Sequence, residues 1–375
     1  MRPRREHSVD RPRIRRKRLK KYLSVESYSA CRERETSRSR GTRNHVSVKH
    51  RLNTWALVLA GGAGSRLHGL TRNPQGVVVP KQFCSLQGGP SLLQEALQRA
   101  AAVAPMQRVC TVVADQHRAW WREMLSYLPD ENIVVQPQNR GTAYGILLPL
   151  VKIAERDPDA IVVMLPADHY LSDEDVLVQA LREIALLAGA SRDSIYLLGM
   201  QPDEPDTELG YILPAQRSPD RPAGVLRFIE KPAVARAQSL LQQGALWNAF
   251  IMAGTARALL RLFDARFDST IETMRTASAS VIETLYGQLR DVDFSRDVLQ
   301  GNEAVLQVLA VPNCGWTDLG TPKRIGITLE RILEAETTSP HRPYIAPHLN
   351  LAHQYDRLHR NRDYPAKFGQ VDLRA

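Results

Sequence analysis

The chain has 375 residues, of which 43% are hydrophobic, and carries a formal net charge of +10 at neutral pH. It is long enough for one large folded domain or two smaller ones. No apolar run reaches the roughly 18 residues of a membrane span, and the basic N-terminus lacks the apolar core of a secretory leader. None of the four cysteines forms a CxxC pair or has metal-site spacing, so we expect reduced thiols in a cytoplasmic protein: Cys31, Cys84, Cys110 and Cys314.

The positive charge is concentrated near the N-terminus. Residues 1–51 hold 18 Lys/Arg against 5 Asp/Glu, a net charge of +13, which leaves −3 for the rest of the chain. The run RPRIRRKRLKK (Arg11–Lys21) could bind nucleic acid or an anionic membrane electrostatically. However, the segment has few apolar residues to fold around, and its only aromatic residues are Tyr22 and Tyr28. We therefore predict a disordered basic extension over residues 1–52, or upstream sequence from a wrong start site, and no nucleic-acid partner.

From Thr54 to Met200 the sequence alternates between strand-like and helix-like segments. The strand-like runs are apolar on both faces, as in a parallel sheet covered on both sides: WALVLAG, RVCTVVAD, NIVVQP, AIVVMLPAD and SIYLLGM. Helix-like segments span 91–103, 117–128, 141–157 and 172–190, the last with Ser172 as its expected N-cap. The alternation predicts a Rossmann-like α/β fold with an open, mostly parallel or mixed sheet flanked by helices.

After Met200 this rhythm changes. GYILPA and GVLRFIEKP predict strands of a mixed or antiparallel part, followed by short helices, the strand AVLQVLAVP and a helix over 321–336. Residues 337–375 are rich in Pro, His, Arg and Asn, which predicts an irregular C-terminal tail. The expected organisation is an extension over 1–52, one folded domain over 53–336 and a tail over 337–375.

The first predicted strand continues into the glycine loop LAGGAGSRL (Leu59–Leu67). Its three glycines let the backbone turn tightly, and the N–H groups of such a loop can surround a phosphate. The loop is neither a Walker motif nor a dinucleotide fingerprint, because Leu67 stands at the place of the third glycine. Arg66 suits a polyphosphate, since a guanidinium can bridge two phosphate oxygens. The glycine cluster by itself is also consistent with a simple strand-to-loop turn.

Further motifs place polar side chains at the ends of predicted strands and loops. Each has a structural alternative: Asp168 or Asp318 could cap the following helix, and Lys231 could be a surface lysine. His169 is expected to be structural. The motifs are PKQF with Lys81, QPQNRGTA with Asn139, Gly141 and Thr142, LPADH with Asp168, FIEKP with Glu230 and Lys231, WNAF with Asn248, and GWTDLGT with Asp318.

With the glycine loop and VDFSRDVL (Val292–Leu299), these blocks follow one another in order from about Trp55 to Ile332. The set resembles the sugar-1-phosphate nucleotidyltransferases, and most closely the mannose-1-phosphate guanylyltransferases. Tyr144 departs from the family pattern, where proline is usual, and Ala249 and Phe250 stand where serine and glycine are common. The isomerase module of bifunctional relatives is missing, so we expect a transferase only.

The resemblance implies transfer of GMP from GTP to mannose 1-phosphate, giving GDP-mannose and pyrophosphate, with Mg²⁺ as cofactor. The attacking phosphate is already anionic, so the reaction requires charge neutralisation and alignment rather than a general base. The resemblance implies catalytic roles for Arg66, Lys81 and Asp168, and magnesium binding by Asp168 and Asp318. It implies nucleotide binding by Gly61, Gly62, Gly64, Ser65, Asn139, Gly141 and Thr142, and sugar-phosphate binding by Glu230, Lys231 and Asn248.

Several alternatives remain open at this point. The base or the hexose could differ from guanine and mannose, because a single sequence does not read either directly. A non-catalytic nucleotide-sugar-binding regulatory protein is a second alternative, although it would not need to keep Arg66, Lys81, Asp168 and Asp318 together. The expected partners are the two small-molecule substrates, with a homodimer as a possible assembly.

Overall fold

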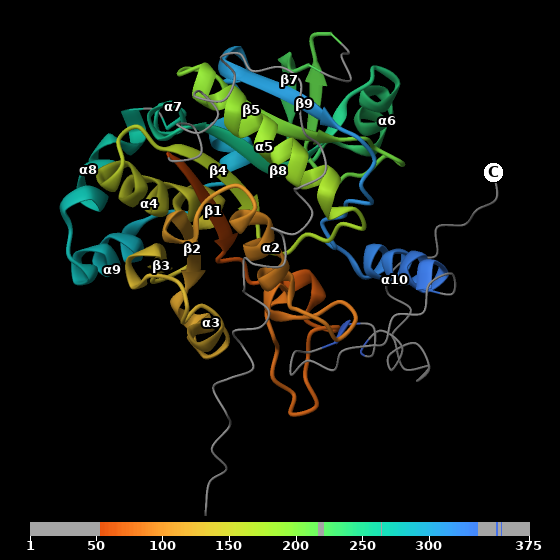
Figure 1. The fold of residues 1–375 in the computed structure, drawn as a ribbon, viewed down its shortest axis with the longest axis horizontal. Coiled ribbons are helices and arrows are strands. Elements are labelled where there is room, and N and C mark those ends of the chain that lie inside the picture. The colour runs from red at the N-terminus through yellow and green to blue at the C-terminus, as the bar shows by residue number, and fades with distance from the viewer. Residues whose placement is uncertain (1–52, 217–220, 264, 337–349, 352–353, 355–375) are drawn as a thin grey trace, which may run out of the picture. The chain divides into compact units, whose positions relative to one another are not determined.

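A nine-stranded mixed sheet forms the centre of the described structure, in the order β3-β2-β1-β4-β8-β5-β9-β7-β6 (Figure 1). Strands β3, β2, β1 and β4 are parallel neighbours, and β5 pairs in parallel with β9. The pairs of β8 with β4, β5 and β6, and of β7 with β6 and β9, are antiparallel. The strands are β1 (Thr54–Ala60), β2 (Val109–Ala114), β3 (Ile133–Gln136), β4 (Ile161–Pro166), β5 (Ile195–Met200), β6 (Tyr211–Pro214), β7 (Ala223–Ile229), β8 (Leu246–Thr255) and β9 (Leu306–Val311).

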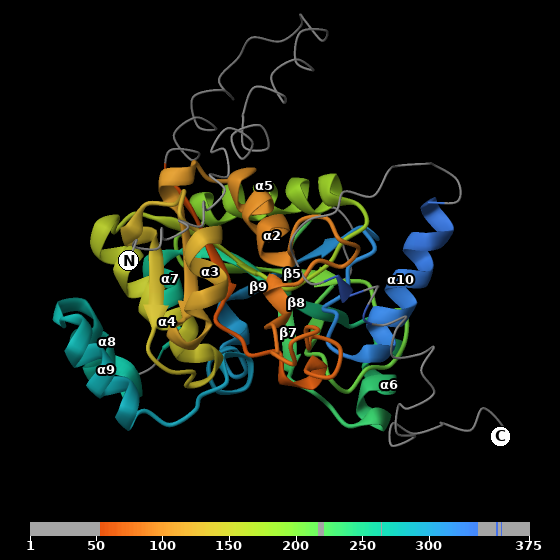
Figure 2. The ribbon, with the colours of Figure 1, turned by 90° about the horizontal axis from the view of Figure 1, so that it is seen from below.

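Helices cover both faces of the sheet, as Figure 2 shows from a second direction. Helices α2 and α5 contact β1, β4 and β5 on one face, and α4 and α7 contact β1, β2 and β8 on the other. Each face therefore has its own hydrophobic core, so β2, β4 and β5 are buried along their whole length. The helices are α2 (Leu92–Ala101), α3 (Arg118–Met124), α4 (Gly141–Arg156), α5 (Glu174–Ala190), α6 (Val234–Gln242), α7 (Ala256–Leu260), α8 (Asp268–Thr276), α9 (Ala279–Gln288) and α10 (Pro322–Glu336).

The computed structural model describes residues 53–216, 221–263, 265–336, 350–351 and 354, all within the second of the chain's two units, Val46–Ala375. The predicted extension over 1–52 and most of the predicted tail over 337–375 lie outside the described residues. Within that tail, Leu351 is buried and donates its N–H to the carbonyl of Ser85 at 2.9 Å. No helix in the described part of the chain is long and apolar enough to cross a membrane.

The sequence-based elements differ from the structure at three places. The helices α8 and α9 were not among the predicted helices. The strand β8, which pairs with β4, β5 and β6 near the middle of the sheet, was missing from the predicted strands. Ser172 is not the N-cap of α5, because its hydroxyl donates to the carbonyl of Cys314 at 3.1 Å. The cap is Asp173, whose side chain accepts the N–H of Val176.

Candidate active site

The carboxyl ends of parallel strands bring three sequence motifs to one edge of the sheet. Strand β1 ends at Ala60 and continues into Gly61, β3 ends at Gln136, and β4 ends two residues before Asp168. In Figure 1 the chain leaving β1 (orange) and helix α10 (blue) lie at the same end of the sheet. Ligands of open α/β sheets bind at this edge.

The glycines of the loop after β1 meet different surroundings. A Cβ on Gly61 would lie 2.2 Å from Gln136 Nε2, and a Cβ on Gly64, which has a φ of +62°, would lie 3.2 Å from the Cβ of Lys81. A Cβ on Gly62 would meet nothing within 4 Å. The absence of a side chain at Gly61 and Gly64 therefore lets the loop pack closely against Gln136 and Lys81, whereas Gly62 faces open space.

Lys81 connects the two acidic motifs. Its side chain is 6% exposed, and its Nζ lies 2.8 Å from Asp168 Oδ2. The same Nζ donates to the main-chain carbonyl of Asp318 at 2.6 Å. Burial by itself would raise the pKa of the Asp168 carboxyl, but the charge and hydrogen bond of Lys81, with smaller contributions from His169 and a backbone hydrogen bond, together hold that pKa below its usual value. Asp168 is therefore an anion with its own cation, and the main chain of Asp318 contacts the same cation.

His169 packs against this cluster as a neutral ring. Burial lowers the pKa of His169 to about 4, although the negative charges of Asp168 and Asp318 both act to raise it. Trp316 Nε1 donates to His169 Nδ1 at 3.2 Å, so the ring proton lies on Nε2, 3.9 Å from Asp168 Oδ1. The ring therefore packs and orients its neighbours at neutral pH and carries no charge.

The Asp318 carboxylate pairs with Arg324, an arginine outside the sequence-predicted set. Arg324 Nη1 donates to Asp318 Oδ1 at 2.9 Å, while Nε and Nη2 donate to Asp206 Oδ2 at 3.1 and 2.5 Å. The guanidinium also lies 5.1 Å from the ring centre of Trp247. Asp318 does not cap α10, because the Arg324 N–H is accepted by the hydroxyl of Thr321.

Arg66 lies on the exposed side of the glycine loop. Together with Ser65 it forms part of a short 3₁₀ turn, Ser65–Leu67, that follows Gly64. Its Nη1 lies 2.5 Å from Glu208 Oε2, and both side chains are about half exposed. Exposed ion pairs of this kind contribute little to stability, so a phosphate can replace the carboxylate at Arg66 at small cost.

The residues predicted to bind the sugar phosphate meet at Gly210. The Asn248 N–H donates to the Gly210 carbonyl at 2.8 Å, and a Cβ on Gly210 would lie 2.5 Å from Glu230 Oε2. Lys231 Nζ lies 3.8 Å from Glu230 Oε1. Burial raises the pKa of Glu230 to about 7, with a further contribution from the charge of Asp293. The cluster combines a carboxyl group that titrates near neutral pH with an amide and an exposed ammonium.

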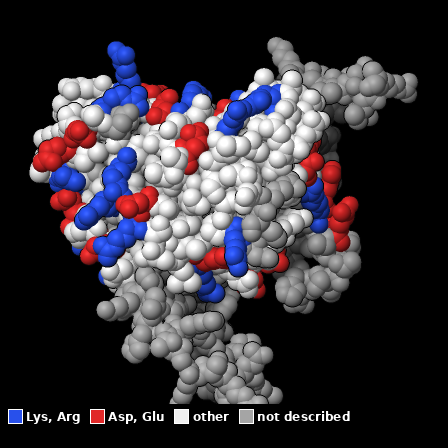
Figure 3. All heavy atoms as spheres, turned by 90° about the horizontal axis from the view of Figure 1, so that it is seen from above, with Lys and Arg blue, Asp and Glu red and all other residues white. Residues whose placement is uncertain are grey.

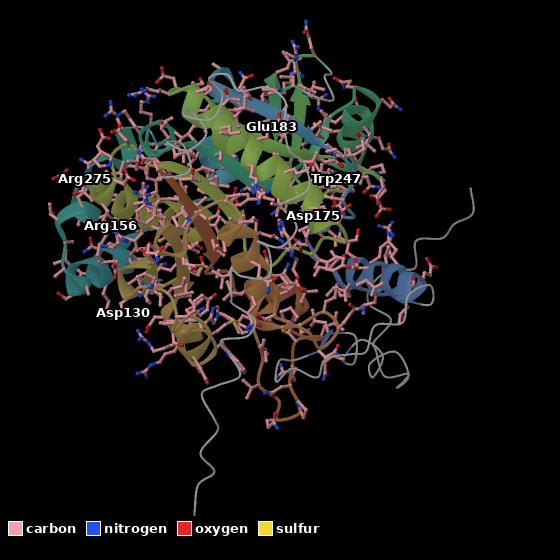
Figure 4. All side chains as sticks on the ribbon, viewed as in Figure 1. Asp130, Arg156, Asp175, Glu183, Trp247 and Arg275 are labelled. Atoms are coloured by element: carbon pink, nitrogen blue, oxygen red, sulfur yellow. The ribbon has the colours of Figure 1, made fainter. Side chains whose placement is uncertain are left out.

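Aromatic rings link this cluster to the Lys81 cluster. The rings of Trp247 and Trp316 lie 6.4 Å apart, and Trp316 contacts His169 at 5.3 Å. Figure 4 shows Trp247 in the half of the sheet that contains β5 and β9, whereas Arg156, Arg275 and Asp130 lie toward the opposite edge. The chain of rings from Trp247 through Trp316 to His169 therefore connects the two motif groups.

Three predicted nucleotide-binding residues have their polar atoms engaged within the protein. Asn139 Oδ1 accepts the Gly141 N–H at 3.0 Å, and Thr142 Oγ1 accepts the Phe294 N–H at 2.7 Å. Gly141 has a φ of +83°, and a Cβ there would lie 2.2 Å from the Val292 carbonyl. These residues hold the start of α4 against the segment 292–294.

Two glutamines at the glycine loop were absent from the predicted site. Gln82 Nε2 donates to the carbonyls on both sides of Gly61 at 2.8 and 2.9 Å. Gln136 is buried between Gly61 and α4, and its Oε1 has no hydrogen-bond partner among the described residues. The signal for Gln136 was its position at the end of a buried parallel strand, inside a motif already noted.

Comparison with known proteins assigns the family. A family model described as Nucleotidyl transferase matches residues 55–333, from the first strand to the last turn of α10. The chain belongs to the nucleotidyl transferase family. The matched region contains every residue of the clusters described above.

The curated relatives that match this chain are named as polysaccharide biosynthesis proteins or as a guanylyltransferase. The alginate biosynthesis protein AlgA of Pseudomonas putida is 29% identical over 70% of this chain and 56% of its own length. The xanthan biosynthesis protein XanB of Xanthomonas campestris is 30% identical over 71% and 57%, and the mannose-1-phosphate guanylyltransferase of Escherichia coli is 35% identical over 52% and 41%. The chain spans about half the length of the curated relatives it matches. The crystal structure of mannose-1-phosphate geranyltransferase from Thermus thermophilus aligns with a TM-score of 0.64 at 27% identity, over 74% of this chain and 79% of that one.

Within this nucleotidyl transferase, a departure from the family motifs coincides with unusual backbone geometry. Phe250, where glycine is common, has a φ of +56°, a region that costs any residue with a Cβ. Asn248 Oδ1 accepts the Phe250 N–H at 3.0 Å, and the ring of Phe250 contacts that of Phe294 at 6.0 Å. The amide of Asn248 therefore keeps its NH₂ group for other partners.

Proposed function

We propose that this chain transfers GMP from GTP to mannose 1-phosphate, giving GDP-mannose and releasing pyrophosphate. Family membership supports the reaction class. The names of relatives such as the Escherichia coli guanylyltransferase support the base and the sugar. The observation that carries the proposal is the buried Lys81 ammonium held between Asp168 and Asp318, at the sheet edge where the glycine loop also lies.

The proposed reaction requires cations and alignment rather than a base. An oxygen of the sugar phosphate attacks the α-phosphorus in line, and the bond to the pyrophosphate group breaks. Arg66 would bind the outer phosphates, and Lys81 would stabilise the negative charge that builds at the α-phosphate. His169, whose pKa is near 4, has no proton-transfer role in this scheme.

The donor set fits a divalent cation that prefers oxygen ligands. Magnesium in nucleotide enzymes is usually held by one or two carboxylates, with substrate phosphates and water completing its coordination. The described residues contain no group of three or more His, Cys, Asp or Glu side chains that could hold a metal ion by themselves, but Lys81 joins the carboxylate of Asp168 to the main chain of Asp318. We propose that these two residues hold Mg²⁺, which when bound would neutralise charge on the substrate phosphates.

Substrate recognition is proposed for the two polar clusters on either side of this centre. Gln136 Oε1, which has no hydrogen-bond partner in the described part of the chain, is a buried acceptor beside Gly61 and suits the N–H donors on the edge of a guanine base. Glu230 and the NH₂ of Asn248, for which the described residues offer no hydrogen-bond acceptor, suit sugar hydroxyl groups, while Lys231 suits the sugar phosphate.

A pyrophosphate-release assay tests the proposal. The purified chain is incubated with Mg²⁺, each of the common nucleoside triphosphates and each of several hexose 1-phosphates. We expect the largest kcat/KM for GTP with mannose 1-phosphate, and its loss in Asp168→Asn by about 10²-fold or more. Asp175→Asn, on the exposed first turn of α5, is the matched control and should retain wild-type activity.

Two results would contradict the proposal in different ways. Preferred use of another triphosphate or hexose would replace the substrates but keep the reaction class. Tight binding of GDP-mannose with no pyrophosphate release from any pair would instead indicate a regulatory protein.

A further inference from the structure

The contacts of Arg324 join three segments that are far apart in the sequence. Arg324 lies on α10, Asp206 lies in the loop between β5 and β6, and Asp318 lies in the loop before α10. The three side chains are only 11%, 14% and 15% exposed, in that order. Charged groups at this level of burial require well-placed partners, and this set provides them through three N–H donors.

We propose that Arg324 is a positioning residue, which orients the Asp318 carboxylate toward the divalent cation through a guanidinium anchored on Asp206. The inference rests on the proposed function, because it concerns the same metal site. It adds a residue that neither the sequence motifs nor the family match identifies.

The two oxygens of Asp318 have different surroundings. Oδ1 accepts the Arg324 Nη1 hydrogen, whereas Oδ2 accepts no hydrogen bond from any group in the described part of the chain. A Cβ on Gly320 would lie 2.2 Å from Oδ2, so the carboxylate can occupy this place only because residue 320 has no side chain. One oxygen is therefore fixed by the arginine and the other remains available as a ligand.

One oxygen of the Asp168 carboxylate is likewise paired with a buried cation. Its Oδ2 is paired with Lys81 Nζ at 2.8 Å, and Lys81 and Arg324 thus each hold one oxygen of one proposed ligand. Groups that orient metal ligands in this way typically change metal affinity or activity by 10- to 100-fold when they are removed.

Asp206, which binds the guanidinium, is itself fixed by several hydrogen bonds. Asp206 Oδ1 accepts the Glu208 N–H at 2.6 Å, and the Tyr211 hydroxyl bonds both the N–H and the carbonyl of Asp206, at 2.8 and 3.0 Å. Since Asp206 Oδ2 takes two donors of Arg324, the planar guanidinium has little freedom to turn. The ammonium of a lysine at position 324 would be a single point charge and could not reproduce the three directed N–H bonds of the guanidinium.

The test compares Arg324→Lys and Arg324→Gln with wild type. Arg324→Lys keeps a cation among the buried carboxylates, so it tests orientation even if Arg324→Gln fails to fold. Arg331→Gln is the matched control, because it removes an arginine from an ion pair on the same helix but at the surface. Arg331 Nη2 lies 3.6 Å from Asp203 Oδ2, and the arginine side chain is 66% exposed. Mn²⁺ is titrated into each protein with and without GTP, and binding is followed by the loss of the free Mn²⁺ EPR signal.

We expect the Mn²⁺ dissociation constant to rise by about 10-fold or more in Arg324→Lys and to stay within about twofold in Arg331→Gln. Activity of Arg324→Lys should recover as Mg²⁺ is raised, a recovery that a merely unstable variant would not show. Wild-type Mn²⁺ affinity in Arg324→Lys, tighter binding in either variant, or no Mn²⁺ binding by the wild type would each overturn the inference. Weaker Mn²⁺ binding in a protein that releases no pyrophosphate would leave the inference standing and reject only the proposed function.

Discussion

Single residues at the site pair negative charge with a dedicated positive charge. Asp168 has Lys81, Asp318 has Arg324, and Glu230 has the exposed Lys231 at 3.8 Å. A buried carboxylate without such a partner takes up a proton, because desolvation disfavours its charged form. The Lys81 ammonium therefore helps to keep Asp168 ionised at neutral pH, which is the form that a cation requires.

Gly62→Ala tests whether the open space at the glycine loop is a ligand site. A Cβ on Gly62 meets nothing within 4 Å in the protein, so the variant should melt within about 1 °C of wild type. If phosphates occupy the space, the dissociation constant for GTP should rise by about 10-fold or more, as measured by calorimetry. Gly61→Ala is the contrasting control, because its Cβ would clash with Gln136 and should lower the melting temperature. Unchanged GTP binding in Gly62→Ala would place the nucleotide elsewhere.

Glu230→Gln tests the elevated pKa of that residue. Burial raises the pKa of Glu230 from 4.5 to about 7, so the folded protein binds a proton at pH values where the unfolded chain has lost it. The stability that Glu230 contributes is therefore complete below about pH 4.5 and is lost as the pH rises through 7. Glutamine cannot ionise, so the stability of the variant relative to wild type should increase between pH 5 and pH 8. Urea unfolding at several pH values measures this trend, and a pH-independent difference would contradict it.

At the scale of elements, β8 changes its neighbouring strand beside the site. Its residues Leu246 and Trp247 pair with β6, and its residues from Met252 to Thr255 pair with β4. The positive φ of Phe250 falls between these two partners, and β5 has a register shift between Leu197 and Gly199 opposite the same region. The strand thus changes its neighbour at a bend, beside the end of β4 that leads to Asp168.

Two substitutions at Phe250 separate backbone strain from packing. Both Phe250→Ala and Phe250→Gly remove the ring that contacts Phe294, but only glycine accepts a φ of +56° without cost. Phe250→Gly should therefore be more stable than Phe250→Ala by about 1 kcal/mol, the reverse of the usual order inside a strand. Urea midpoints of the two variants decide the matter, and an alanine variant equal to or more stable than the glycine variant would show that the bend carries no strain.

At the scale of the whole molecule, charge is unevenly divided along the chain. Residues 1–51 carry a net charge of +13, and the rest carries −3. On the face drawn in Figure 3, basic and acidic side chains are interspersed and form no continuous basic patch. The family match begins at residue 55, beyond the basic segment.

Removal of residues 1–50 should therefore leave the proposed reaction intact. None of the clusters described here includes a residue of that segment, so we expect kcat and KM for both substrates within about twofold of the full-length chain. Steady-state pyrophosphate release by the two proteins makes the comparison. A loss of more than 10-fold at equal melting temperature would give the basic segment a role in the reaction.

The sequence by itself determined the strand–helix alternation from β1 to β5 and the end of the sheet at which the motifs gather. These features are local, because an apolar run and its following glycine or carboxylate lie within a few residues of each other. The predicted N-cap at Ser172 was wrong because two neighbouring residues were both suitable caps. A hydrogen bond from Ser172 to Cys314, distant in sequence, decided between them.

Only the tertiary structure revealed β8 and Arg324. The strand changes partners at a bend within it, so it has neither a uniform period nor one set of neighbours to leave a pattern. Arg324 resembles any solvent-facing arginine of an amphipathic helix, and its partner Asp206 is 118 residues away. Such contacts depend on how distant segments pack together, because the free energy of pairing two charges is set by their separation and burial rather than by their spacing in the chain.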